Sequence, residues 1–116
     1  MKFKKRERDG VVIIDVSGQL MGGPEADAFH ALVKEVLEGG SKQLLVNLAK
    51  VTWMNSTGLG ILLRAYASVC NADGQLKLMK LTDRVRSLIV ITKLYTIFEI
   101  FEEEDEALAS FQAAKS

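Results

Sequence analysis

The chain has 116 residues, of which 48% are hydrophobic, so it is long enough for one domain with a buried core and too short for two ordinary domains. Its 15 basic residues balance its 15 acidic residues, which argues against a nucleic-acid-binding protein, because such proteins usually carry a basic excess. The N-terminus lacks the apolar stretch of a signal peptide, and no apolar run approaches the roughly 18 residues of a membrane span, so we expect a cytoplasmic domain without membrane insertion.

The first residues predict a hairpin with an exposed outer strand. Residues 2–8 are rich in basic side chains and poor in apolar ones, which is typical of a solvated edge strand. The pair Asp9-Gly10 is a strong turn signal. It precedes VVIIDVSG (11–18), a β-branched segment typical of a buried strand. We therefore expect residues 2–8 to pair with residues 11–18.

A first helix is predicted after Gly22-Gly23-Pro24, residues that end the preceding strand. Proline suits the first turn of a helix, and Gly39-Gly40 is a common stop signal. The apolar residues between these signals recur at helical spacing, namely Phe29, Leu32, Val33, Val36 and Leu37. The segment that follows, KQLLVNLA (42–49), predicts a second buried strand.

A second helix is predicted from a further apolar stripe that ends near Asp73-Gly74. The stripe consists of Leu59, Leu62, Leu63, Tyr66 and Cys70. The segment QLKLMKL (75–81) then predicts a third strand of the sheet.

The C-terminal third predicts two more helices and one more strand. Thr82 or Asp83 can cap a third helix, and TIFEIF (96–101) predicts a short strand. The acidic run from Glu102 to Glu106 opens a last helix, because acidic side chains suit the positive end of a helix dipole.

Strands thus alternate with helices after an opening hairpin, which predicts an α/β fold. We expect a mixed, mostly parallel sheet of about four to five strands with about four helices packed on it. No repeat or linker divides the sequence, so a single domain over residues 1–116 is expected.

The stretch MNSTGLG (54–60) raises the main functional question. Asn55, Ser56 and Thr57 stand where a strand passes into a helix, and such residues are ordinary helix caps, worth about 1 kcal/mol. Open α/β folds also place their sites at these turns, and the free amides of a helix start favour a phosphate. The residues alone leave both readings open. The phosphate-binding loop GxxxxGK[ST] and a complete dinucleotide fingerprint are both absent.

The remaining candidate residues do not assemble into a catalytic set. His30 is the only histidine and Cys70 the only cysteine, so we expect no catalytic residue, no metal and no cofactor. Cys70 is predicted to be a small core residue, and Asp15 to lie on an outer face or to cap a neighbour. Trp53 belongs either to the core or to a contact surface, where tryptophan is enriched.

The segment NLAKVTWMNSTGLGILL, which follows the strand LLV, resembles the signature of the STAS domain. It is especially similar to that of the bacterial anti-sigma factor antagonists, whose pattern runs from an apolar strand through Asp-Ser-Ser/Thr-Gly-Leu-Gly into a helix. VVIIDVSGQL resembles the early strand and glycine of the family, and QLKLMKLTDRVRSLIVITKLYTIFEIFEEEDEAL resembles its later half. The resemblance covers nearly the whole chain.

This resemblance implies a partner-switching regulator that is not an enzyme. In the family, the serine before Ser/Thr-Gly-Leu-Gly is phosphorylated by an anti-sigma factor that is itself a serine kinase, and a phosphatase removes the phosphate. The matching position here is Ser56. The implied partner-binding surface consists of Met21, Gly22, Gly23, Asn55, Ser56, Thr57, Gly58 and Leu59. Met21–Gly23 and Ser56 both follow strands at the same end of the predicted sheet, so we expect them to be neighbours.

Two positions depart from the family pattern. Asn55 replaces the usual aspartate before the serine, and Met21 replaces the usual acid in the loop after the early glycine. The alternative reading is a STAS subunit without serine phosphorylation, which serves a signalling, transport or lipid-trafficking complex.

Overall fold

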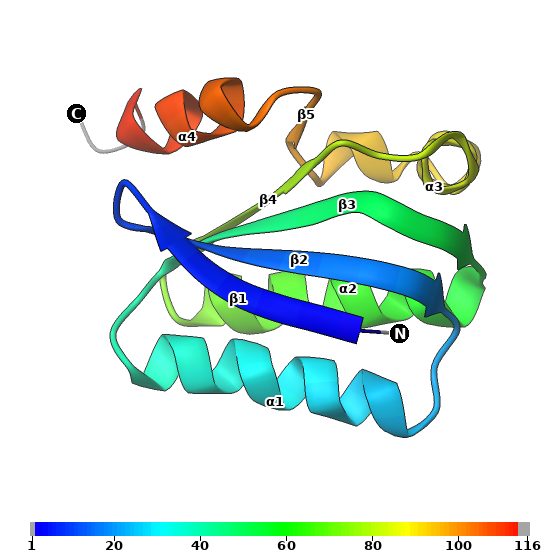
Figure 1. Cartoon of the computed structure of the whole chain (residues 1–116), viewed down its shortest axis with the longest axis horizontal. Coiled ribbons are helices and arrows are strands. Elements are labelled where there is room, and N and C mark those ends of the chain that lie inside the picture. Colours follow the sequence, from blue (N-terminus) through cyan, green and yellow to red (C-terminus); the bar gives the residue numbers. More distant parts are fainter. Residues whose placement is uncertain (1, 114–116) are drawn as a thin grey trace.

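The computed structural model describes residues 2–113 of the chain. Its elements in chain order are β1 (Lys2–Arg8), β2 (Val11–Leu20), α1 (Pro24–Glu38), β3 (Gln43–Met54), α2 (Ser56–Asn71), β4 (Gln75–Met79), α3 (Asp83–Ile91), the 3-10 turn η1 (Leu94–Thr96), β5 (Ile100–Phe101) and α4 (Glu104–Ala113). The strands form one sheet in the order β1-β2-β3-β4-β5 (Figure 1). The predicted α/β fold with a mixed, mostly parallel sheet is confirmed. The predicted domain bounds, residues 1 and 116, lie outside the described residues.

The opening hairpin forms as predicted. β1 pairs with β2 in antiparallel fashion, from Lys2 opposite Ser17 to Arg8 opposite Val11. Asp9 and Gly10 have φ values of 54° and 79°, the positive angles that a tight two-residue hairpin turn requires. The other strand pairs are parallel.

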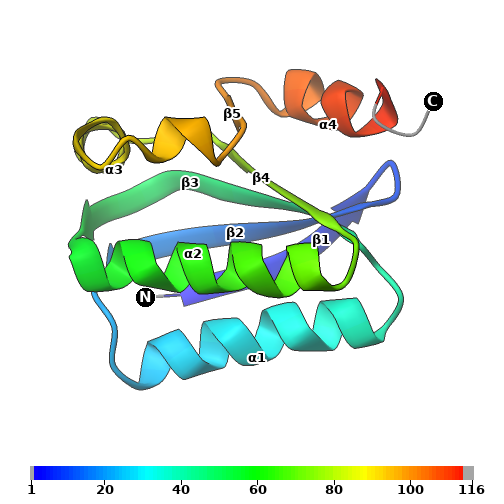
Figure 2. The same cartoon turned by 180° about the vertical axis from the view of Figure 1, so that it is seen from behind.

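Helices α1 and α2 cover one face of the sheet, and α4 lies over the other (Figures 1 and 2). Helix α3 is drawn above the sheet near its other end, but its Val85 and Ile89 pack in the main core with α1 and α2. Alternate residues of β2 therefore enter two different layers. Val12, Ile14 and Val16 pack in the main core with α1 and α2. Val11 and Ile13 pack with α4 in a second cluster. Because both faces are covered at the start of β2, residues 11–14 are all apolar instead of alternating with polar residues.

Strand β3 is longer than the predicted strand 42–49, since it continues to Met54. Among its last four residues, two are buried and two are exposed. Val51 and Met54 are fully buried, whereas Trp53 is 39% exposed. The extension brings the sheet directly to Ser56, the first residue of α2.

The prediction of a strand over residues 96–101 was wrong for its first four residues. Lys93 adopts a left-handed φ of 60°, and the amides of Ile97 and Phe98 both donate to the carbonyl oxygen of Leu94 at 3.0 Å. These donors are used within the local turn and cannot pair with β4. Only Ile100–Phe101 joins the sheet.

The prediction that Cys70 is a core residue was also wrong, because its thiol is exposed. The buried residues in the second half of α2 are Leu62, Ala65 and Val69. Cys70 follows Val69 by one position, a rotation of about 100° around the helix. That rotation carries it out of the apolar face.

Candidate functional site

Ser56 begins helix α2 and is exposed to solvent. The preceding residue, Asn55, has an extended backbone and is the N-cap. Its side-chain oxygen accepts a hydrogen bond of 2.9 Å from the amide of Gly58, and its carbonyl accepts one of 2.9 Å from Leu59. The predicted helix start within two residues of Ser56 is confirmed. The cap is formed by Asn55, which leaves the Ser56 hydroxyl at the surface.

The electrostatic setting of Ser56 is that of a helix start without a negative charge. The first turn of α2 contains no acidic residue, and the cap residue Asn55 is neutral. The partial positive charge of the helix start is therefore not offset within its own first turn. An anion attached to Ser56 would be stabilised by this field.

The loop after β2 lies against the start of α2, as the sequence predicted. A Cβ atom added to Gly22 would lie 2.7 Å from Cγ2 of Thr57. One added to Gly58 would lie 1.7 Å from the carbonyl oxygen of Leu20. Two glycines thus allow close approach between the two segments. Their meeting forms the candidate surface, which we define as Met21, Gly22, Gly23, Asn55, Ser56, Thr57, Gly58 and Leu59.

The members of the candidate surface differ in what they present to solvent. Ser56 and Thr57 are exposed, and Met21 is 44% exposed. In contrast, Gly58 is buried and Leu59 is only 4% exposed. These two residues hold α2 against the loop and the core.

Trp53, which precedes the candidate surface by two residues in the chain, stacks with Arg84, a residue that has no signal in the sequence. The guanidinium carbon of Arg84 lies 3.6 Å from the centre of the Trp53 ring, a cation–π stack. The stack is possible because Thr82 binds α3 to β3, with its hydroxyl donating to the carbonyl of Val51 at 3.0 Å. Exposed tryptophan and arginine are the residue types most often found at binding hot spots.

A separate charged cluster joins β1, β2 and α4. Arg6 donates to both Asp15 (Nε–Oδ2 2.8 Å) and Glu104, and Arg8 also donates to Glu104 at 2.7 Å. The hydrogen bond from Arg6, the largest cause, lowers the pKa of Glu104 to about 2 against the effect of partial burial. Glu104 belongs to the acidic run that was predicted to open the last helix, and its side chain is only 18% exposed.

Asp15 is the centre of the same cluster on the β2 side. Burial by itself raises the pKa of its carboxyl group, but the hydrogen bonds from Arg6 and Asn47 outweigh this effect and leave the pKa lowered. The amide of Asn47 donates to Oδ1 of Asp15 at 2.8 Å. Asp15 is therefore a charged, fully partnered structural residue.

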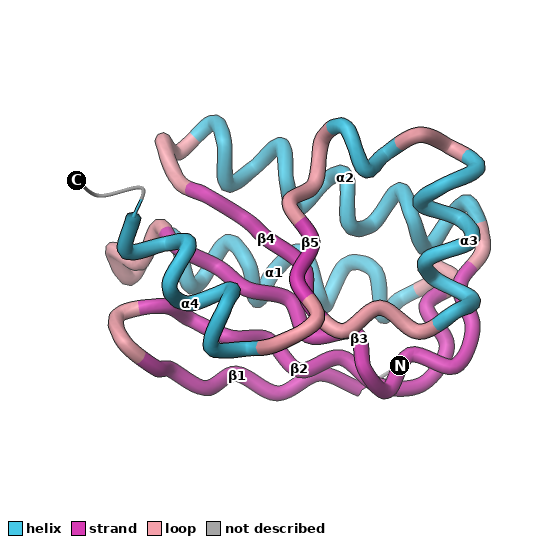
Figure 3. Tube along the Cα trace, turned by 90° about the horizontal axis from the view of Figure 1, so that it is seen from above, coloured by secondary structure: helices cyan, strands magenta, loops and turns pink. Residues whose placement is uncertain are grey.

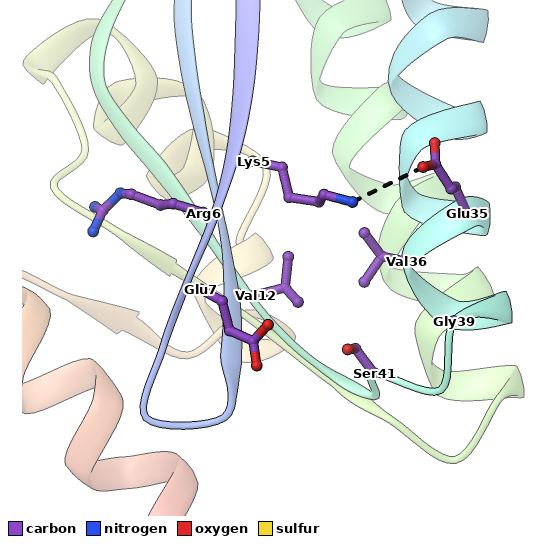
Figure 4. A pocket seen from close by; sticks show the side chains of 8 residues that line it. All are labelled: Lys5, Arg6, Glu7, Val12, Glu35, Val36, Gly39 and Ser41. Atoms are coloured by element: carbon purple, nitrogen blue, oxygen red, sulfur yellow. Dashed lines mark ion pairs between the residues drawn. The ribbon is translucent and has the colours of Figure 1, made fainter.

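A cavity of about 400 Å³ lies between β1 and α1 (Figure 4). Lys5 and Glu35 face each other across it, with 3.9 Å between Nζ and Oε1. Its lining includes Ser41, which stands just before the start of β3, whereas Ser56 follows the end of that strand. The cavity shares no residue with the candidate surface and lies toward the opposite end of the sheet.

Within residues 2–113, no group of three or more histidine, cysteine, aspartate or glutamate residues is arranged to hold a metal ion. Among the same residues, no helix combines the length and apolar character needed to cross a membrane.

Comparison with known sequences agrees with the geometry of this site. Residues 2–107 match the family model of the STAS domain. The anti-sigma-B factor antagonist of Listeria monocytogenes is 35% identical over 111 residues, which cover 91% of this chain and 91% of that protein.

Solved structures share the fold over nearly the whole chain. An anti-sigma factor antagonist from Mycobacterium paratuberculosis has a TM-score of 0.81 at 25% identity, covering 94% of this chain and 92% of that one. The unphosphorylated form of the Bacillus anti-sigma factor antagonist SpoIIAA also has a TM-score of 0.81, at 18% identity and 97% coverage of both chains. The chain therefore belongs to the STAS domain family, whose members include these anti-sigma factor antagonists.

Proposed function

We propose that this protein is a bacterial anti-sigma factor antagonist that works by partner switching. In its unphosphorylated state it binds an anti-sigma factor, which is also a serine kinase, and so releases the sigma factor. Phosphorylation of Ser56 ends the binding, and a phosphatase restores it. In this proposal residues 1–116 act as one cytoplasmic STAS domain, a binding module without catalytic activity.

One observation carries the proposal: Ser56 is an exposed hydroxyl on the first turn of α2, beside the loop Met21–Gly23. The candidate surface contains no histidine or lysine to activate it as a nucleophile, and the only histidine of the sequence, His30, is in α1. A hydroxyl in this position suits modification by another enzyme. The names of the curated relatives support the same class of partner.

The physical basis of the switch is a difference between the free and the bound state. A phosphate adds about −1.5 to −2 charges at neutral pH. In the free protein the start of α2 stabilises that charge, and the fold is kept. In the complex the partner covers the phosphate, which must then give up its hydration shell. This desolvation is costly unless the partner supplies a cation.

The exposed side chains around Ser56 give the surface its apolar contacts. Met21 and Trp53 are 44% and 39% exposed, respectively, and Arg84 holds the Trp53 ring in place. A pre-ordered aromatic side chain loses little conformational entropy on binding. We expect these three residues to contribute to the affinity for the anti-sigma factor.

Asn55 preserves the geometry of the site but removes a charge from it. It caps α2 through its side-chain oxygen, which an aspartate in its place could also do. The aspartate that is usual in the family would add a negative charge next to the hydroxyl. We therefore expect Asn55 and Met21 to affect how the kinase recognises this protein as a substrate, and to leave the fold the same as with the acids usual in the family.

The proposal is tested with the candidate anti-sigma factor kinase from the same genome. The protein is incubated with kinase and ATP, and the site of modification is found by mass spectrometry. We expect one phosphate on Ser56, none in Ser56→Ala, and unchanged modification in Thr57→Ala. Ser56→Asp should keep its unfolding temperature and bind the kinase at least about tenfold more weakly, which corresponds to 1.4 kcal/mol.

Asn55→Asp supplies the decisive comparison. If the kinase needs an acid before the serine, this variant will be phosphorylated faster than the natural protein. Phosphate on Thr57, or no phosphate on either protein, would contradict the proposal and favour a STAS subunit that works without phosphorylation.

A further inference from the structure

A strip of the sheet is left open on the side that carries α3 and α4. Viewed from that side, α4 lies toward the hairpin end and α3 toward the other end, and the middle of β1, β2 and β3 has no helix over it (Figure 3). A cavity of about 570 Å³ lies on this strip. None of the residues that line it belongs to the candidate surface around Ser56.

The polar lining of this groove is organised in two rows that cross three strands. One row consists of Lys2, Ser17 and Lys50, which are neighbours in the strand register. The adjacent row consists of Lys4, Asp15 and Asn47. Directly paired residues of neighbouring strands project from the same face of a sheet. The two rows therefore present three lysines, one carboxylate, one hydroxyl and one amide, and Arg6 also lines the groove.

The single carboxylate does not neutralise the lysines. Asp15 is held by Arg6 at 2.8 Å and by Asn47 at 2.8 Å. Within residues 2–113, Lys2, Lys4 and Lys50 form no ion pair, and the hydroxyl of Ser17 has no hydrogen-bond partner. The groove thus carries a local excess of positive charge and of free hydrogen-bond donors, although the chain as a whole has no net charge.

The spacing of these charges indicates the kind of anion that fits. With a rise of about 3.3 Å per residue, Lys2 and Lys4 are about 7 Å apart along β1, and strands about 4.8 Å apart place Lys2 and Lys50 about 10 Å from each other. Lysines spread over this distance can each contact a different oxygen of two linked phosphate groups. The Phe3 ring faces the other side of the sheet, where it packs on Phe29 with 5.9 Å between ring centres, so it offers no stacking platform in the groove.

We propose that this groove binds a small anion with at least two phosphate groups, independently of the partner switch at Ser56. Lys2, Lys4 and Lys50 would contact the phosphates, and Ser17 and Asn47 would orient them. The network of Arg6 and Asp15 fixes the floor of the groove. Because the lysines are exposed, binding should weaken as salt is added.

The test is titration of the isotope-labelled full chain with inorganic pyrophosphate, followed by NMR and calorimetry. We expect saturable binding that shifts the amides of Ser17, Asn47 and Lys50, and weaker binding of monophosphate. Lys4→Gln/Lys50→Gln should reduce the affinity by about tenfold, since exposed ion pairs each contribute modestly to binding. The matched control Lys34→Gln/Lys42→Gln removes the same charge at exposed positions outside the groove and should bind as the natural protein does.

Three results would overturn the proposal. The first is no saturable binding of pyrophosphate by the natural protein. The second is an equal loss in the groove variant and the charge-matched control, which would indicate attraction by overall charge alone. The third is a groove variant that loses the anti-sigma factor but not pyrophosphate, which would assign the groove to an acidic protein surface. Lys2→Gln/Lys4→Gln provides a second groove variant if the first does not fold.

Discussion

Gly58 is the residue at which the two segments of the candidate surface meet most closely. It belongs to the NSTGLG stretch, and its amide also donates the capping hydrogen bond to the side-chain oxygen of Asn55. An added Cβ would lie 1.7 Å from the carbonyl oxygen of Leu20 and 2.6 Å from its carbon. Backbone atoms cannot move aside as a flexible side chain can. The absence of a side chain at position 58 is therefore what permits the loop and helix to form one surface.

At this scale we predict opposite outcomes for two neighbouring glycines of α2. Gly58→Ala should lower the free energy of unfolding by about 2–3 kcal/mol, because the helix must move away from β2. Gly60→Ala is the control, since a Cβ there would meet nothing within 4 Å. It should be neutral or raise that free energy by about 0.5–1 kcal/mol. Urea unfolding measures both, and equal effects would contradict the prediction.

At the scale of elements, α4 is bound to the hairpin through the charges of Glu104, Arg6 and Arg8. The pKa of Glu104 is lowered from 4.5 to about 2, so its charged form is favoured in the folded state. A group with a lowered pKa contributes stability above its unfolded pKa and loses it as the pH falls toward the folded value. The contribution is thus complete above about pH 5 and disappears toward pH 2.

Glu104→Gln should therefore reduce the free energy of unfolding by about 1–2 kcal/mol at pH 7, a value discounted for partial exposure. The difference from the natural protein should shrink as the pH falls from 5 to 2. Glu103→Gln, an exposed residue of the same acidic run, is the control and should show little effect. Unfolding by denaturant at several pH values tests this, and a constant difference over the whole range would refute it.

At the scale of the whole molecule, the side of the sheet that bears α4 is separate from the end that bears Ser56. α4 buries Phe111 completely in the second cluster. Beside it lies Lys77, a lysine only 4% exposed, whose Nζ is 4.7 Å from the centre of the Phe111 ring and donates to Ser110 at 2.9 Å. This arrangement stabilises the fold without touching the candidate surface.

We expect Phe111→Ala to lower the free energy of unfolding by about 3–5 kcal/mol, because it removes a fully buried aromatic ring. Tyr95→Ala, at a position 53% exposed, should change it by no more than about 0.5 kcal/mol. Under conditions where Phe111→Ala remains folded, its affinity for the anti-sigma factor should equal that of the natural protein. A weaker complex would show that the two regions are coupled.

The predictable part of this protein was the part encoded by local patterns. The hairpin turn at Asp9-Gly10, the apolar periodicity of α1 and the start of α2 at Ser56 were predicted to within a few residues. The neighbourhood of Met21–Gly23 and Ser56 also followed from the sequence, because parallel strands end at the same edge of a sheet. For the turn, the helix periodicity and the helix start, the deciding interactions lie within a few residues of one another in the chain.

The sequence by itself determined the fold class, the family resemblance and the exposed serine at a helix start. Only the tertiary structure decided that residues 96–99 turn instead of joining β5, that Cys70 is exposed, and that Arg84 covers Trp53. The structure also brought Arg6 and Glu104 together across 98 residues and gathered three lysines of β1 and β3 around one groove. These arrangements depend on which strands pair and which helix covers which face, so no short stretch of the sequence contains them.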